Sequence, residues 1–296
     1  MPECAPALIS RRLAVFGAAA TVLVRPRQSI AGTDQKRPAV IDWAAAETLL
    51  TMGIKPVGIA DHHGFRETFQ SFANLQGVTD LGSTWEPNLE YMDRLKPDAI
   101  YLPGWSAISR PQLESIAPVR LCSIHGSGGD PVERAIEFSR TVLSHYPEAE
   151  QRDVMLGAQR RLADMQRQLP PRRIVLINLH GTNRFVNIYA AGSLPDSVAK
   201  HSGLKNAWTS DVNGFGFSSI GIEKLMTVSD SDIVILNQGR LTANALTAME
   251  DNSLWAGLPA VREGRVHLTQ PVSIFGGLAS ATALAEWFSA TFSDAS

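Results

Sequence analysis

Three histidines stand at positions where an imidazole could bind a metal ion. His63, His125 and His180 are each followed by glycine and each come after a short apolar run, as in LCSIHG and LINLHG. Histidines from several strand ends could converge on zinc or manganese together with a carboxylate. Glycine also ends strands, however, and histidine is common in polar loops. A divalent-metal carrier is therefore one interpretation among several.

Aromatic side chains supply a second candidate site. They fall at the ends of apolar runs or in loops, at Phe65, Trp85, Trp105, Phe215, Phe217 and Phe275. Trp105 follows the run DAIYLP, and ligands of open α/β sheets bind beyond the carboxyl ends of strands. Loop aromatics facing a cleft suit a bulky, largely apolar ligand, and Arg66 would offer planar donors to its oxygens. Haem or cobalamin would also suit such a cleft, whereas each aromatic taken singly could equally pack in the core.

Signs of catalysis are weak. The sequence contains no phosphate-binding glycine loop, no G-x-S-x-G elbow and no H-E-x-x-H motif. Asp61 and His62 could form an acid–base pair, but nothing near them supplies a nucleophile. The net charge of −2 also argues against a nucleic-acid partner, which would require a basic face. We therefore expect a binding protein and not an enzyme.

The candidate residues are carried by short apolar runs that alternate with helical patterns. These runs are KPVGIAD (55–61), DAIYLP (98–103), VRLCSI (119–124), RIVLINL (173–179), DIVILN (232–237) and RVHLT (265–269). Continuous apolar strands indicate parallel sheets covered on both faces. We expect an α/β protein of two lobes with mainly parallel sheets, joined by one long bridging helix, with the ligand cleft between the lobes.

The bridging helix is predicted from a regular spacing in the centre of the chain. Between about 148 and 169, apolar residues recur every three or four positions, and Pro170 and Pro171 then stop the pattern. The expected division is a signal peptide (1–31), an N-terminal lobe (32–145), the bridging helix (146–170) and a C-terminal lobe (171–296).

The two predicted lobes repeat each other. GIKPVGIAD (53–61) and GLKNAWTSD (203–211) have the same length, and NLEYMDRLKPDAIYL lines up with GIEKLMTVSDSDIVIL. In the second pair, Glu90 and Glu223 each fall in the first turn of a helix that leads into a buried strand. A carboxylate at a helix start interacts favourably with the exposed N–H groups. Two matches in the same order suggest duplicated lobes.

The N-terminus has the features of an export signal. SRRLAVF begins it with paired arginines, an apolar run to Val24 follows, and Ser29-Ile30-Ala31 offers a small-x-small cleavage site. The apolar run is too short to span a bilayer. The segment resembles a twin-arginine signal, which predicts a periplasmic protein. Cleavage after Ala31 would leave Cys122 as the only cysteine, and its apolar surroundings predict a small core residue.

This organisation resembles that of the periplasmic binding proteins for ferric siderophores, haem and vitamin B12, particularly the members that bind ferric hydroxamates. The resemblance is carried by ISRR, MGIKPVGIAD, LGSTWEPNLEYMDRLKPD, KNAWTSDVNGFGFSSIGIEKL and LWAGLPAVREGRV with the following IFGG. It implies a monomer that captures a ferric siderophore and delivers it to an inner-membrane ABC importer. The chain would need no cofactor, because a hexadentate siderophore already fills the coordination sphere of its iron.

The resemblance also implies roles for single residues. Thr84 and Ser106 fall about where hydroxamate-binding relatives place a cleft arginine and a tyrosine, and Ser273 falls at a family tryptophan position. Trp85 and Trp105 stand beside the first two positions and would supply bulk without the donors of an arginine. Glu90 and Glu223 match the glutamates with which the family docks onto the dimeric permease. Complementary charge of this kind sets register and association rate.

Overall fold

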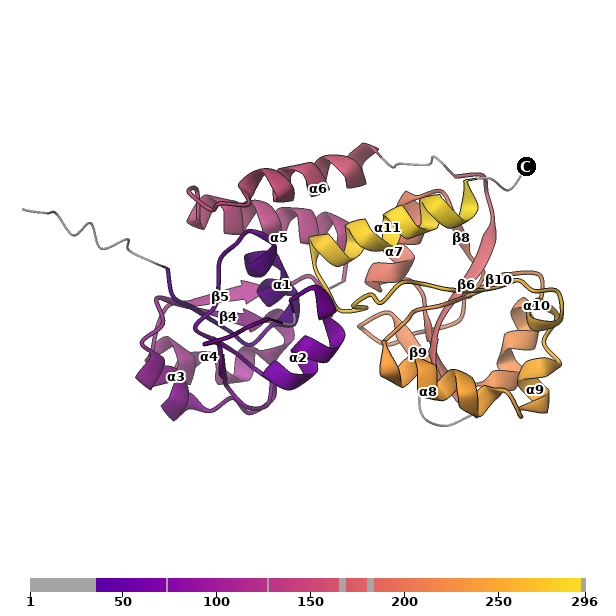
Figure 1. Ribbon diagram of the computed structural model, residues 1–296, viewed down its shortest axis with the longest axis horizontal. Helices are drawn as coiled ribbons and strands as arrows, with labels where there is room; N and C mark the ends of the chain where they lie inside the picture. Colours follow the sequence, from indigo (N-terminus) through magenta and orange to yellow (C-terminus); the bar gives the residue numbers. More distant parts are fainter. Residues whose placement is uncertain (1–35, 73, 127, 165–168, 180–183, 294–296) are drawn as a thin grey trace, which may run out of the picture. The chain divides into compact units, whose positions relative to one another are not determined.

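The computed structural model describes residues 36–72, 74–126, 128–164, 169–179 and 184–293 (Figure 1). The predicted signal peptide (1–31) and His180 lie outside these residues. The first sheet has the strand order β3-β2-β1-β4-β5 and is parallel throughout. Its strands are β1 (Pro38–Val40), β2 (Gly58–Ile59), β3 (Thr79–Asp80), β4 (Ala99–Pro103) and β5 (Val119–Cys122).

Helices cover both faces of this first sheet. They are α1 (Trp43–Thr51), α2 (His62–Thr68), η1 (Gln70–Phe72), α3 (Leu89–Leu95), η2 (Gly104–Ser109), α4 (Arg110–Glu114) and α5 (Pro131–His145). Successive residues of a strand point to opposite faces, so Ala39 of β1 joins one apolar cluster and Val40 joins another. Burial on both faces explains why the strands read as unbroken apolar runs.

The second sheet is mixed. Its order is β11-β10-β6-β7-β9, with β8 also paired to β6. The strands are β6 (Arg173–Leu179), β7 (Phe185–Tyr189), β8 (Lys205–Asn206), β9 (Phe217–Gly221), β10 (Asp232–Ile235) and β11 (Val266–Leu268). The pairings of β6 with β8 and β10, and of β10 with β11, are parallel, whereas β7 pairs antiparallel with β6 and β9.

The remaining helices surround the second sheet and connect it to the first half of the chain. They are α6 (Arg152–Asp164), α7 (Leu194–His201), η3 (Ile222–Val228), α8 (Arg240–Met249), α9 (Ser253–Ala256), α10 (Pro259–Arg262) and α11 (Leu278–Phe292). Helix α11, yellow in Figure 1, packs against α6, α7, α5 and α1. One apolar cluster accordingly runs from α1 through α5 and α6 to α7 and α11. No helix in the described part of the chain is long and apolar enough to cross a membrane.

The predicted repeat corresponds to equivalent elements. In the first sheet the order is β2-β1-β4-β5, and in the second it is β8-β6-β10-β11. Helix α1 leads through Ile54 into β2 as α7 leads through Leu204 into β8. The N–H of Ile54 donates to the carbonyl of Leu49, and that of Leu204 donates to Ala199, both at 2.9 Å. Strands β7 and β9 are additional to this common pattern.

The central helix is shorter than the sequence pattern predicts. Helix α6 begins at Arg152, not near Glu148, because α5 ends at His145 and turns follow Pro147. Leu169 continues the apolar spacing but lies in a bend, with its N–H bonded to the carbonyl of Ser202 at 3.2 Å. The apolar spacing therefore begins several residues before helix α6 does. At its other end it includes Leu169, which is buried but not helical.

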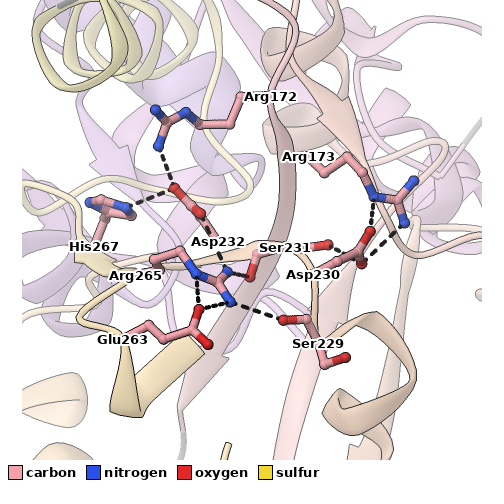
Figure 2. A network of polar contacts seen from close by, with 9 residues as sticks. All are labelled: Arg172, Arg173, Ser229, Asp230, Ser231, Asp232, Glu263, Arg265 and His267. Carbon is pink, nitrogen blue, oxygen red and sulfur yellow. Dashed lines mark hydrogen bonds and ion pairs between the residues drawn. The ribbon is translucent and has the colours of Figure 1, made fainter. Parts of the chain in front are cut away.

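A polar network fixes the amino ends of the strands in the second sheet (Figure 2). Asp232, which is 5% exposed, accepts hydrogen bonds from Arg172 at 2.7 Å and from the ring of His267 at 3.1 Å. The guanidinium of Arg265 lies 3.5 Å from the same carboxylate and donates to the carbonyls of Ser229 and Ser231. A buried charge that is paired several times in this way is costly to disturb.

Candidate ligand-binding site

A cavity of about 370 Å³ lies where the strands of the first sheet end. Its lining comes from segments that follow β1, β2, β3, β4 and β5, and from two segments of the second half of the chain. The lining residues are Ile41, Asp42, Trp43, Asp61, Thr84, Trp85, Pro103, Trp105, His125, Phe215, Phe217 and Phe275. This is the edge at which open α/β sheets bind ligands. Half of these residues are Trp or Phe, which makes the wall largely apolar.

Aromatic rings form a continuous series across the cavity. The ring centroids of Trp85 and Trp105 are 4.5 Å apart, and Trp105 lies 6.3 Å from Phe215. Phe275 then lies 6.3 Å from Phe215 and 6.2 Å from Phe217. These spacings are typical of interacting aromatic pairs. Residues from both halves of the chain, about 130 positions apart in sequence, thus meet around one space.

The ring of Phe215 is held by a tight turn. The side-chain oxygen of Asn213 accepts from the N–H of Phe215 at 2.9 Å and from that of Phe217 at 3.2 Å. Gly216 between them has φ of +77°, and a Cβ there would lie 2.1 Å from the nitrogen of Ser193. Only glycine fits such a conformation and approach. Phe215 precedes β9, whereas Phe217, predicted in a loop, is the first residue of that strand.

His125 closes the inner side of the cavity. It is 8% exposed, its Nε2–H donates to the carbonyl of Gly276 at 2.9 Å, and its ring meets Phe275 edge-on. Burial lowers the pKa of His125 to about 4, because a charged imidazole would lose its hydration. The side chain is therefore neutral near pH 7 and links the two halves of the chain.

Two aspartates supply the acidic part of the lining. Asp42 caps α1 by accepting from the N–H of Ala45 at 2.8 Å, and Asp61 caps α2 by accepting from Gly64 at 3.1 Å. Burial raises the pKa of Asp42 to about 6. Both positions follow directly from the fold, because β1 and β2 each run into a helix whose start needs a side-chain acceptor.

Some residues predicted for the site lie elsewhere. Phe65 is fully buried and stacks on Phe69 at 4.5 Å, so it packs in the core beneath Trp43. Arg66 is exposed on α2, and neither Arg66 nor Ser106 lines the cavity. Ser273 is buried and lines a different hollow. Tyr101, within the strand that precedes Trp105, lies in the core of the first half of the chain.

The histidines expected for a metal carrier are not assembled among the described residues. His63 is exposed on α2, 3.5 Å from Glu67, while the Nε2 of His125 is bound to a carbonyl. Within the described ranges no group of three or more His, Cys, Asp or Glu side chains could hold a metal ion.

The two glutamates with a predicted docking role are exposed. Glu90 lies in the first turn of α3 with 76% of its side chain exposed, and Arg94 is its neighbour one turn later. Glu223 lies in the first turn of η3 and lines a hollow together with Phe185 and Leu254. Neither glutamate lines the aromatic cavity.

Five lining residues were not predicted as part of the ligand site: Ile41, Asp42, Trp43, Asp61 and Pro103. A signal for three of them is present in the sequence. VIDWAAAE has an apolar strand, an aspartate and a helical pattern in direct succession, which places Asp42 at a helix start beyond a strand end. The strand β1 is only three residues long, so it gave no clear apolar run.

Comparison with known proteins shows which family this architecture belongs to. A profile of the periplasmic binding protein family matches residues 39–272, most of the chain. The chain belongs to the periplasmic binding protein family. It is 27% identical over 285 residues to the iron(3+)-hydroxamate-binding protein FhuD of Escherichia coli (strain K12), covering 93% of each chain. It is 25% identical over 247 residues to the Fe(3+)-citrate-binding protein YfmC of Bacillus subtilis (strain 168), covering 81% of this chain and 75% of the relative.

Solved structures of similar proteins share the fold. A Vibrio cholerae siderophore-binding protein, FhuD, bound to Fe3+–Desferal superposes with a TM-score of 0.73 at 22% identity, covering 87% of this chain and 98% of that one. The catecholate-siderophore-binding protein VctP of the same species gives a TM-score of 0.67 at 15% identity, covering 86% and 93%. Proteins that share this fold therefore bind siderophores of different chemistry, so the ligand has to be argued from the cavity.

Proposed function

We propose that this periplasmic binding protein captures a ferric siderophore of the hydroxamate class and delivers it to an inner-membrane ABC importer. The observation that supports this most directly is the series of aromatic rings from both halves of the chain around one cavity. Such a wall suits a bulky complex with an apolar surface. The iron is cargo and brings its own ligands, so the cavity has only to bind the organic shell.

The charge of the cavity favours hydroxamates over catecholates. Three hydroxamate groups cancel the charge of Fe(III), whereas three catecholates leave the complex strongly anionic. Asp42 and Asp61 line the cavity, and among the described lining residues no Lys or Arg offsets them. Bringing an anionic complex beside these carboxylates would cost free energy through like-charge repulsion. A neutral complex avoids that cost.

Binding measurements with a panel of ligands test the assignment to hydroxamates. The protein lacking residues 1–31 would be incubated with a ferric trihydroxamate, a ferric tricatecholate, ferric citrate, haem, cobalamin and zinc, and examined by native mass spectrometry. We expect one trihydroxamate complex per chain. Exclusive binding of the catecholate, citrate, haem, cobalamin or zinc would refute the hydroxamate assignment and would identify the cargo instead.

Delivery is assigned to Glu90 and Glu223. Both carboxylates are exposed at a helix start, and exposed apolar side chains stand beside them, Tyr91 near the first and Met226 near the second. Equivalent acids on two repeated halves suit a two-fold symmetric permease with basic pockets. The carrier itself acts as a monomer and reaches the periplasm through its N-terminal signal.

The double variant Glu90→Ala with Glu223→Ala tests the docking role. We expect loss of siderophore-dependent growth with unchanged ligand affinity and melting temperature. Glu133→Ala with Glu250→Ala removes two other acids from helix termini and serves as the control for net charge. Normal transport by the first double variant would exclude the docking role, and loss of ligand binding would place these glutamates in the binding site.

A further inference from the structure

The cavity continues into a second, more polar hollow. This hollow has a volume of about 370 Å³ and shares Asp61, Thr84 and Trp85 with the aromatic cavity. It adds Asp80, the last residue of β3, whose Oδ1 accepts from the N–H of Gly82 at 2.9 Å. A ligand in the aromatic cavity could therefore extend a substituent along a wall that adds the carboxylate of Asp80 and the hydroxyl of Ser83.

The lining of the two spaces is negatively charged. Three carboxylates contribute, Asp42, Asp61 and Asp80, and among the described residues no Lys or Arg lines either space. The one histidine of the lining, His125, is buried and bonded to a carbonyl. Arg66 is the nearby cation of α2, but it is exposed and lines neither space.

Helix capping does not by itself require these charges. Asp42 and Asp61 each accept one N–H at a helix start, and asparagine or serine caps a helix about as well as aspartate does. Asp61 also has φ of +46°, a left-handed conformation that asparagine tolerates equally. The positive end of α1 offsets part of the charge of Asp42. Three ionisable acids around a site without a basic residue still leave a negative field.

The faces of aromatic rings, like the negative field, favour a positively charged ligand. Trp85 lines both spaces, is 70% exposed, and its ring lies 4.5 Å from that of Trp105 at an interplanar angle of 46°. The face of an indole ring attracts cations. Carboxylates beside exposed tryptophan faces are a combination that binds an ammonium group.

We propose that the preferred cargo is a ferric hydroxamate complex that carries a positive charge, on an amine arm that lies along Asp61 and Asp80. This inference rests on the proposed function and refines its substrate class. The aromatic cavity holds the neutral iron–hydroxamate part, and the adjoining hollow holds the ammonium group.

The test compares two ligands that differ in one charge. The first is a ferric linear trihydroxamate with a free terminal amine, and the second is the same complex with the amine acetylated. Dissociation constants would be measured by tryptophan fluorescence for the wild type, Asp61→Asn, Asp80→Asn and the control Asp153→Asn. Asp153 lies exposed in the first turn of α6 and lines neither space.

We expect the wild type and the control to bind the free amine about fivefold more tightly than the acetylated complex, the factor expected for one charge pair about 4 Å apart in water. In Asp61→Asn and Asp80→Asn the ratio of the two dissociation constants should fall towards unity. Comparing ratios removes the effect of the acetyl group's bulk. An equal ratio in all four proteins would overturn the inference. Failure of both complexes to bind would instead refute the proposed function.

Discussion

Glu47 should make the stability of this protein fall as the pH rises. It lies on α1, is 3% exposed, and accepts hydrogen bonds from the N–H of Gly277 and the hydroxyl of Ser280 at the start of α11. Burial raises the pKa of Glu47 from 4.5 to about 7, because desolvation of the carboxylate outweighs these hydrogen bonds. Between these two values the folded chain binds more protons than the unfolded chain does. The free energy of unfolding therefore decreases as pH rises across this window.

The magnitude follows from the size of the shift. A difference of about 2.5 pKa values corresponds to about 3 kcal/mol in full, of which about 2 kcal/mol is lost between pH 5 and pH 7.5. Glu47→Gln keeps the size of the side chain and one acceptor oxygen, as in the protonated acid, but cannot ionise. The free energy of unfolding of Glu47→Gln should therefore lack the decrease that ionisation of Glu47 causes in the wild type. The raised pKa of Asp42 also makes the stability fall as pH rises, whereas the lowered pKa of His125 has the opposite effect. Both groups are present in the wild type and in Glu47→Gln, so their effects cancel in the comparison.

Urea unfolding of the wild type and Glu47→Gln at pH 5.0 and pH 7.5 measures the effect. We expect the wild type to lose about 2 kcal/mol more than the variant between the two conditions. Parallel behaviour of the two proteins would refute the argument that burial dominates at this carboxylate. A larger loss in the variant would show that the ionised form is the stabilised one.

Four further variants test ligand binding, stability and export individually. Trp105→Ala should weaken ferric trihydroxamate binding by about 1 to 3 kcal/mol in a fluorescence titration, and unchanged affinity would remove Trp105 from the site. Phe65→Ala should lower the free energy of unfolding by about 3 to 5 kcal/mol, because it empties a core position, and a variant as stable as the wild type would contradict that packing. Asp232→Ala should cost about 3 to 5 kcal/mol in urea unfolding, since it leaves Arg172 and Arg265 without their shared buried partner (Figure 2); an unchanged midpoint would show that the network adds nothing. Arg11→Lys with Arg12→Lys should retain the precursor in the cytoplasm by cell fractionation, and normal periplasmic accumulation would exclude the twin-arginine route.

The sequence predicts the strands that are buried on both faces. DAIYLP, RIVLINL and DIVILN correspond to β4, β6 and β10, because both faces of these strands need apolar side chains. Strand β7, with the sequence FVNIY, was missed. It pairs antiparallel and alternates buried with less buried positions, so it forms no continuous apolar run. The antiparallel part of the second sheet was missed for the same reason.

Part of the candidate site was accessible to sequence reasoning as well. Trp105 follows a strand that could be recognised, so its position at the carboxyl edge could be inferred from topology. Phe65 has the same sequence signature as a loop aromatic, yet it is buried beneath Trp43. Whether such a ring meets a ligand or the core depends on packing between distant segments, which local patterns do not encode. Asp42 was missed because its strand is so short.

Fluorescence titration of the protein lacking residues 1–31 with a ferric trihydroxamate tests the central claim most directly. Trp43, Trp85 and Trp105 line the cavity, so an iron complex bound there should quench tryptophan emission. We predict saturable quenching that reaches its limit at one complex per chain. A titration of free tryptophan with the same ferric trihydroxamate serves as the blank. Emission that stays unchanged up to saturating concentrations of the ferric trihydroxamate would contradict the account.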